Sequence, residues 1–198
     1  MHPQRCTLVV SVAVLALGFN PLVGSAQSPD DFVPVTDAML QNPDPAHWLM
    51  WRRTLDSWGY SPLDQISRDN VDELRLVWSR GLTEGRQQGT PLVYDGVMYM
   101  PNPSDVIQAI DAATGDLVWE HRREVPEDIE DYMFDGLWQN NRNLAIYGEF
   151  IIDTSVDDHV FALDAATGRL AWETEILYYT VNPAMQSSGP IVANGKVI

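Results

Sequence analysis

An eleven-residue phrase occurs twice in this chain and limits what the chain can fold into. Residues 109–119 read AIDAATGDLVW and residues 162–172 read ALDAATGRLAW; the two copies are identical at eight positions and offset by 53 residues. A repeat with a period of about 50 residues is typical of stacked β units and not of a domain folded once. The phrase therefore predicts a repeat protein built from β-sheets.

The residues that both copies share each have a structural use. The Asp side chain can hydrogen-bond the backbone of the turn that follows, and the Gly can take the positive φ that ends the turn. The Trp offers a large flat surface that suits packing between neighbouring sheets. These residues are Asp111, Gly115 and Trp119 in the first copy and Asp164, Gly168 and Trp172 in the second.

A hairpin pattern precedes each phrase. Residues 91–99 (PLVYDGVMY) alternate around Asp95-Gly96, a pair favoured in two-residue hairpins. Residues 144–152 repeat the pattern around Gly148, and residues 190–198 repeat it around Asn194-Gly195. Each unit is therefore predicted to contain a hairpin, a short strand, a turn and a strand ending in Trp, which is one four-stranded blade of an all-β propeller. The alternative is a β-sandwich with accidental internal similarity.

The blade count indicates an incomplete ring. Residues 74–78 (LRLVW) resemble the end of a blade phrase without its turn, as expected of an atypical terminal repeat. The chain thus holds about three blades, whereas a propeller needs roughly four to eight to close. We interpret residues 46–198 as the N-terminal part of a longer propeller, incomplete at its C-terminus. Alone, such a piece is expected to be inactive and to aggregate, because its strand edges are unpaired.

The remaining mature segments are a lead-in and an insertion. Residues 27–45 are a polar linker or lead-in with a helix expected around residues 37–41. Residues 47–60 hold three of the seven tryptophans, which we assign to the core and not to a cofactor platform. Residues 124–141 interrupt the repeat with an acidic stretch that we interpret as a solvated loop on the binding face of the ring. Its carboxylates do not have the spacing of a metal site.

The N-terminus has the features of an export signal. Arg5 precedes an apolar run at residues 8–18, and small residues at 23–26 stand where a signal peptidase would cut. We predict a cleaved signal peptide at residues 1–26 and a periplasmic location; a retained anchor is the alternative.

Charge and cysteine content exclude several function classes. The net charge of −16 disfavours binding to nucleic acid or anionic lipid and suits a soluble protein or a basic partner. Cys6 is the only cysteine and lies in the leader, so a mature chain would have no disulfide, thiolate zinc site, thiol nucleophile or covalently attached haem.

The ordered set of motifs resembles the pyrroloquinoline quinone (PQQ)-dependent alcohol dehydrogenases of the methanol/ethanol type. The likeness runs from Trp51 to the end of the chain. The matching pieces are Tyr60-Ser61-Pro62-Leu63, Asn70-Val71, Trp78, Thr90-Pro91-Leu92-Val93, Asp95 to Tyr99, both AxDAATGxxxW phrases, Asn141-Arg142, Leu144-Ala145 and Ser188-Gly189-Pro190.

The resemblance implies an eight-bladed periplasmic propeller that binds PQQ over its central channel. It also implies a calcium ion that polarises the quinone, and an aspartate base that takes the proton of an alcohol or sugar hydroxyl. Electrons would pass to cytochrome c or a membrane quinone, and a homodimer is left open. No residue of this chain is assigned as catalytic, because the calcium ligands and the aspartate are expected beyond Ile198.

Three cofactor-binding positions follow from the resemblance. Arg142 matches the family arginine in its Asn-Arg-x-x-Ala context, and a guanidinium suits the three carboxylates of PQQ. Gln88 stands where the family usually has a glutamate, and Ser187 stands where it usually has a threonine. The alternatives are an Arg142 paired with the acidic loop, and ordinary loop roles for Gln88 and Ser187.

The chain also departs from the family pattern. The family's adjacent cysteine pair is absent, and Leu137 and Trp138 stand near its place as substitutes that could cover the cofactor. A non-catalytic propeller scaffold of the outer-membrane assembly type and a degenerate quinoprotein that binds PQQ poorly are the competing interpretations.

Overall fold

The computed structural model describes residues 31–133, 142–184 and 188–198. Two four-stranded antiparallel sheets dominate it, and each pairs its strands in sequence order. The predicted four-stranded blades are therefore confirmed. The first blade comprises β1 (Leu92–Tyr94), β2 (Val97–Asn102), β3 (Val106–Asp111) and β4 (Leu117–Arg122). The second comprises β5 (Ala145–Tyr147), β6 (Phe150–Thr154), β7 (His159–Asp164) and β8 (Leu170–Glu175).

A two-stranded hairpin, β9 (Val192–Ala193) with β10 (Lys196–Val197), begins a third unit. Its turn residues Asn194 and Gly195 have φ of 50° and 68°, and Asp95 and Gly96 in the β1–β2 turn have φ of 46° and 78°. Positive φ at both central residues is the geometry that matches the twist of a two-residue hairpin. The sequence prediction of these two turns is confirmed.

The repeated phrase forms the turn between the last two strands of each blade. Asp111 Oδ1 accepts the backbone N–H groups of Ala113 and Thr114, each at 2.9 Å. In the second blade Asp164 Oδ1 accepts the N–H of Thr167 at 2.8 Å. Both aspartates therefore cap the turn, as the sequence indicates. The strand that follows continues beyond its Trp, since β4 and β8 extend three residues past the predicted end.

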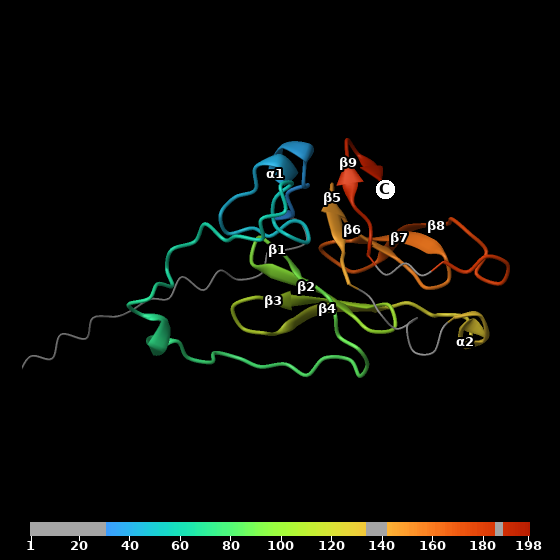
Figure 1. Ribbon diagram of the computed structural model, residues 1–198, viewed down its shortest axis with the longest axis horizontal. Helices are drawn as coiled ribbons and strands as arrows, with labels where there is room; N and C mark the ends of the chain where they lie inside the picture. Colours follow the sequence, from blue (N-terminus) through green and yellow to red (C-terminus); the bar gives the residue numbers. More distant parts are fainter. Residues whose placement is uncertain (1–30, 134–141, 185–187) are drawn as a thin grey trace, which may run out of the picture.

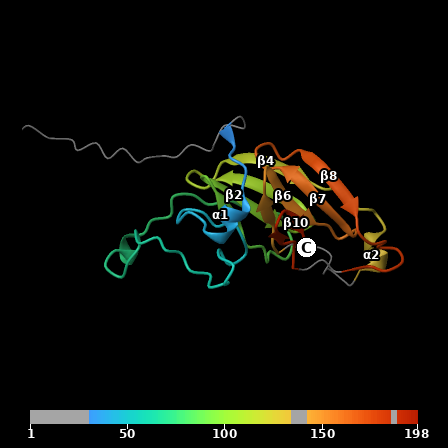
Figure 2. The same cartoon turned by 90° about the horizontal axis from the view of Figure 1, so that it is seen from above.

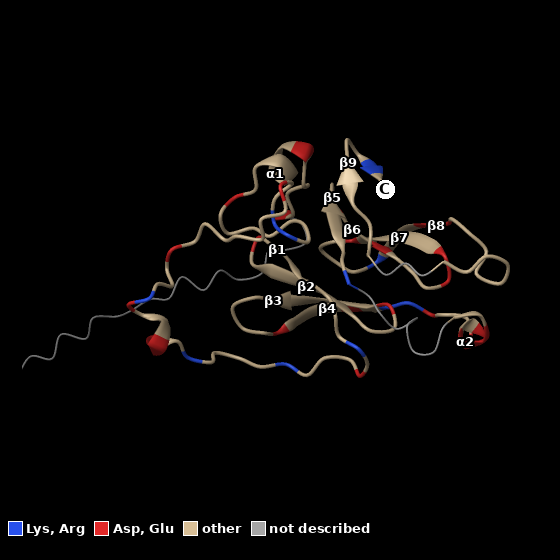
Figure 3. Cartoon of the chain, in the orientation of Figure 1, with Lys and Arg blue, Asp and Glu red and all other residues tan. Residues whose placement is uncertain are grey.

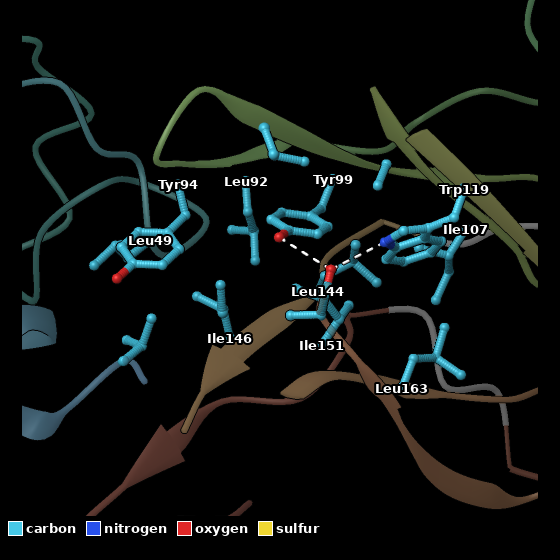
Figure 4. Packing of buried hydrophobic residues seen from close by; sticks show 14 of the residues in the cluster. Leu49, Leu92, Tyr94, Tyr99, Ile107, Trp119, Leu144, Ile146, Ile151 and Leu163 are labelled. Carbon is cyan, nitrogen blue, oxygen red and sulfur yellow. Dashed lines mark hydrogen bonds between the residues drawn. The ribbon is translucent and has the colours of Figure 1, made fainter. Parts of the chain in front are cut away.

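The main core lies between the first two blades. Its buried apolar side chains come from both sheets and from the N-terminal segment, and Figures 1 and 2 show the two sheets side by side. Tyr99 Oη and Trp119 Nε1 of the first blade both donate to the carbonyl oxygen of Ala165 in the second, at 3.2 and 2.9 Å (Figure 4). The Trp packs between neighbouring sheets, as predicted.

Glycine is required where this Trp meets the next blade. Gly168 has φ of 72°, and a Cβ atom there would lie 2.6 Å from the Trp119 ring. The same contact recurs one unit earlier between Gly115 and Trp78, whose Nε1 donates to the carbonyl of Ala112 at 3.1 Å. Each tryptophan thus docks on the AATG turn of the next unit.

The N-terminal segment fastens the two blades together. Helix α1 (Asp37–Gln41) forms where it was predicted, and the hydroxyl of Thr36 accepts the N–H of Met39 at 3.3 Å as its N-cap. Single β-bridges join Val35 to Gly148 and Trp48 to Val93. The segment therefore contacts the first hairpin of both blades.

One expectation for residues 47–80 is wrong and another is met only in part. Residues 74–78 form no strand among the described residues and follow a 3₁₀ turn at Val71–Glu73, yet Trp78 docks on the next unit as a blade-ending Trp does. The tryptophans of the aromatic cluster are not all core: Trp51 and Trp58 are 53% and 73% exposed. Large apolar side chains such as these are expected to be buried, but no segment among the described residues packs over Trp51 and Trp58 enough to bury them.

The insertion after β4 is acidic but partly anchored. It contains α2 (Ile129–Tyr132), which carries Glu130 and Asp131 and is partly red in the cartoon of Figure 3. Ile129 and Met133 are buried against Val156 of the second blade. The solvated-loop interpretation is therefore correct only for the charged face of this segment. No helix in the described ranges is both long and apolar enough to cross a membrane.

Candidate cofactor-binding site

Three segments that lead into the first strand of each unit lie against one another. They contain Gln88 before β1, Arg142 before β5 and Ser188 before β9. The backbone N–H of Thr90 donates to the carbonyl of Arg142 at 2.8 Å. The side-chain Nδ2 of Asn143 donates to the carbonyl of Ser188. The second segment is thus bound to both the first and the third.

Two of the predicted residues meet directly. Arg142 Nε donates to Gln88 Oε1 at 2.7 Å, across 54 positions of sequence. Gln88 is exposed and Arg142 is half-buried. Because an amide carries no charge, Gln88 orients the guanidinium without neutralising it.

The third segment approaches the second so closely that only glycine fits. Gly189 has φ of 75°, and a Cβ atom there would lie 2.1 Å from the carbonyl oxygen of Asn143. The sequence marks Gly189 only as part of the Ser188-Gly189-Pro190 motif and gives no separate indication of Asn143. The signal available was their position, since each stands just before the first strand of a blade.

Several predicted positions lie outside the described residues. These are Ser187, the substitute pair Leu137 and Trp138, and the whole signal peptide at residues 1–26 with Cys6. Their assignments stay predictions.

A second polar cluster joins the blades at the same end of the sheets. Arg123, which follows β4, donates from Nη2 to Asp157 Oδ2 at 2.9 Å and from Nη1 to Glu173 Oε2 at 2.6 Å. Asp105, between β2 and β3, accepts from the hydroxyl of Ser155 and from the N–H of Val156 at 3.3 Å. The sequence does not reveal this cluster, because nothing in the local pattern around its members marks them as partners until the two sheets meet.

Burial and pairing shift the titration of this cluster in opposite directions. Burial raises the pKa of Asp105 to about 6, despite the hydrogen bonds from Ser155 and Val156. For Asp157, burial acts to raise the pKa, but the hydrogen bonds from Arg123 and Ser155 outweigh it and lower the pKa. With Asp105 bound by Ser155 and Val156, and Arg123 bound by Asp157 and Glu173, the cluster serves as a joint between blades.

The arrangement around Arg142 is suited to an anionic ligand. A guanidinium offers five N–H donors in a planar fork, and Gln88 accepts from Nε. A carboxylate can accept two parallel hydrogen bonds from such a fork. The three joined segments fix the backbone from which that fork extends.

Comparison with known proteins identifies a family that shares this architecture. Residues 48–197 match the family model described as the glucose/ethanol/alcohol dehydrogenase β-propeller domain of PQQ proteins. The chain is 38% identical over 161 residues to the dehydrogenase subunit of the quinone alcohol dehydrogenase from Gluconacetobacter polyoxogenes, covering 78% of this chain and 21% of that protein.

Solved structures agree. A quinohemoprotein alcohol dehydrogenase from Pseudomonas putida HK5 superposes with a TM-score of 0.71 and 33% identity, covering 83% of this chain and 24% of that one. A europium-containing methanol dehydrogenase gives a TM-score of 0.68 and 26% identity, covering 81% and 28%.

The chain thus spans between a fifth and a third of the length of these proteins. The family match covers every strand from β1 to β10, the three segments that lead into β1, β5 and β9, and both copies of the repeated phrase. The chain belongs to the PQQ-dependent glucose/ethanol/alcohol dehydrogenase β-propeller family.

Proposed function

We propose that this chain is the N-terminal part of a periplasmic PQQ-dependent dehydrogenase that oxidises an alcohol or sugar hydroxyl. Electrons would leave to cytochrome c or a membrane quinone. The observation that carries the proposal is the hydrogen bond of 2.7 Å by which Gln88 of the first blade orients Arg142 of the second. It lies within the segment that matches the family model.

The residues present fit an anionic cofactor. PQQ bears three carboxylates, and the joined segments present a guanidinium held by a neutral amide. Where the family usually has a glutamate, Gln88 adds an amide group that can both donate and accept, and removes one negative charge from the site. These features favour binding of a carboxylate-bearing ligand.

The chemistry is divided between the cofactor and the chain. PQQ, when bound, supplies the two-electron acceptor for alcohol oxidation. Arg142 would bind a cofactor carboxylate and Gln88 would hold the guanidinium in the orientation to do so. Ser187 is proposed to donate its hydroxyl to a cofactor oxygen. The calcium ligands and the aspartate base are assigned to parts of the whole protein outside residues 1–198.

Periplasmic location rests on the leader. The apolar run at residues 8–18 and the small residues at 23–26 support export and cleavage near Ala26. Recovery of the protein in a periplasmic extract, with Gln27 as the first residue by N-terminal sequencing, is the expected result; an intact leader on a membrane-bound protein would contradict it.

The cofactor assignment is tested by binding and by turnover in the whole protein. With PQQ and Ca²⁺, the complete reading frame should reduce a dye in the presence of alcohols or aldoses and should retain PQQ absorbance after desalting. Arg142→Ala should weaken PQQ binding by about 10- to 100-fold, because a charge-assisted hydrogen bond is lost. Arg169→Ala, which removes an exposed arginine, is the matched control. Equal PQQ affinity in the Arg142 and Arg169 variants would contradict the assignment.

A further inference from the structure

The N-terminal segment forms an open pocket beside α1. The pocket has a volume of about 610 Å³, within the range of roughly 300–1,000 Å³ that is usual for small-molecule sites. Its walls come mainly from α1, from residues 42–45 and from residues 53–54, in the blue to cyan part of the chain in Figure 1. The pocket shares no lining residue with the segments around Arg142.

A buried arginine forms part of the pocket wall without a charged partner. Arg53 is only 7% exposed, and none of the ion pairs among the described residues involves it. Its Nη2 group donates to the carbonyl oxygens of Pro43 and Asp44 at 3.3 and 3.2 Å, and its Nε atom is buried with no hydrogen-bond partner. Arginine is almost never buried to this extent unless it is paired, because a buried charge without a counter-charge is costly. The described part of the chain therefore leaves this guanidinium incompletely satisfied.

The remaining donor group of Arg53 is open to a ligand. Nη1 makes no hydrogen bond to the described residues, and it is not one of the enclosed atoms that lack a partner. A group in the pocket can therefore reach Nη1 while the bonds of Nη2 stay in place. The backbone of Arg53 is also unusual, since its φ of 69° is a left-handed conformation that residues other than glycine seldom adopt. Such conformations cluster at functional sites.

The other lining residues limit the class of ligand. Met39, Pro45 and Pro62 give the pocket apolar walls, which suit a hydrocarbon group. Asp44 also lines the pocket; its Oδ1 atom accepts the backbone N–H of Ala46 at 2.9 Å and forms no ion pair with Arg53. Because Asp44 repels anions, a ligand with one negative charge is favoured over a ligand with two.

We propose that this pocket binds a monocarboxylate with an apolar body. The carboxylate accepts from Nη1 of Arg53 and supplies the missing counter-charge, and the hydrocarbon part lies against Met39 and the two prolines. The inference does not depend on cofactor binding, because it invokes neither Arg142 nor Gln88.

Titration calorimetry on the complete protein tests the site, with hexanoate and its neutral counterpart hexanamide as probes. Hexanoate should bind about tenfold more tightly or better, because only the carboxylate forms a charge-assisted hydrogen bond with Arg53. Arg53→Gln should remove this preference. Arg52→Ala, which removes the exposed neighbouring arginine, should keep it. Arg142→Ala should keep it as well, which separates this pocket from the proposed cofactor site.

Equal affinity of the wild type for the two probes would overturn the proposal, as would a preference that survives Arg53→Gln or is lost to the same extent in Arg52→Ala. If Arg53→Gln fails to fold, Gln41→Trp takes its place. Gln41 is an exposed residue of α1 that lines the pocket, so an indole there should fill the pocket while Arg53 is kept. Hexanoate binding should then weaken about tenfold, and an unchanged affinity would overturn the proposal.

Discussion

Arg142 and Gln88, 54 positions apart, share a hydrogen bond of 2.7 Å between Nε and Oε1. The contact joins the segment before β5 to the segment before β1, which the backbone bond from Thr90 to Arg142 also connects. Two loops of different blades thereby act as one unit. The orientation of the guanidinium then depends on a residue of the preceding blade.

Replacing Gln88 tests this dependence. Gln88→Ala should weaken PQQ binding by the whole protein about 3- to 10-fold, because a typical hydrogen bond contributes about 0.5–1.5 kcal/mol. Gln88→Glu should retain the bond to Arg142 but add a negative charge near the ligand. Titration calorimetry checks both variants, with the exposed neighbour Gln87→Ala as the comparison. An affinity unchanged in Gln88→Ala would show that Arg142 is oriented by other contacts.

Gly168 should be far more sensitive to substitution than Gly96. Both have left-handed φ, 72° and 78°, so a side chain at either costs about 1–2 kcal/mol in backbone strain. Only at Gly168 would the new Cβ meet an obstacle, the Trp119 ring at 2.6 Å, whereas nothing lies within 4 Å at Gly96. Urea denaturation should therefore show a loss for Gly168→Ala that exceeds that for Gly96→Ala by about 1–3 kcal/mol. Equal losses would mean that the ring moves aside freely.

Adjacent arginines should differ in their contribution to stability. Arg123 is 11% exposed and is bound by Asp157 and Glu173, so Arg123→Ala should cost about 3–5 kcal/mol by leaving the buried Asp157 carboxylate without its guanidinium partner. Arg122 is 57% exposed and pairs only with Glu120 in the described residues, so Arg122→Ala should cost about 0–1 kcal/mol. Urea unfolding of the two variants measures the two losses of unfolding free energy. Similar values would indicate that the Arg123 bridges are as weak as a surface pair.

Asp105 should make the blade interface less stable as pH rises from about 4 to about 6. Its folded-state pKa, raised to about 6 by burial, exceeds the unfolded value, so the folded state binds more protons in this window. The unfolding free energy contributed by this group therefore falls with rising pH, by an amount on the order of 3 kcal/mol. Asp157, whose pKa is lowered, contributes with the opposite sign at lower pH.

The difference between the wild type and Asp105→Asn isolates this titration. Asn cannot ionise, so the variant should lack the decline between pH 4 and 6 while retaining the contributions of Asp157 and Arg123. Urea unfolding at half-unit pH intervals measures the two curves. Parallel curves would show that Asp105 does not titrate in this range.

Much of the blade architecture could be predicted from local sequence. The turns at Asp95-Gly96 and Asn194-Gly195 and the capping aspartates Asp111 and Asp164 depend on conformational preferences of single residues and their nearest neighbours. Such preferences recur wherever the same short pattern recurs. The 53-residue offset could therefore identify the repeated unit before any contact between units was known.

Contacts between blades were decided by the tertiary structure. The bond between Arg142 and Gln88, the joint formed by Asp105 with Ser155, and the exposure of Trp51 and Trp58 depend on which surfaces the folded sheets bring together. The bonded residues lie 54 and 50 positions apart. For Trp51 and Trp58, no local sequence pattern specifies which other segment would bury them. A sequence pattern specifies which groups can bond, whereas packing of whole sheets determines which of them meet, because burial and hydrogen bonding are settled only when the surfaces close.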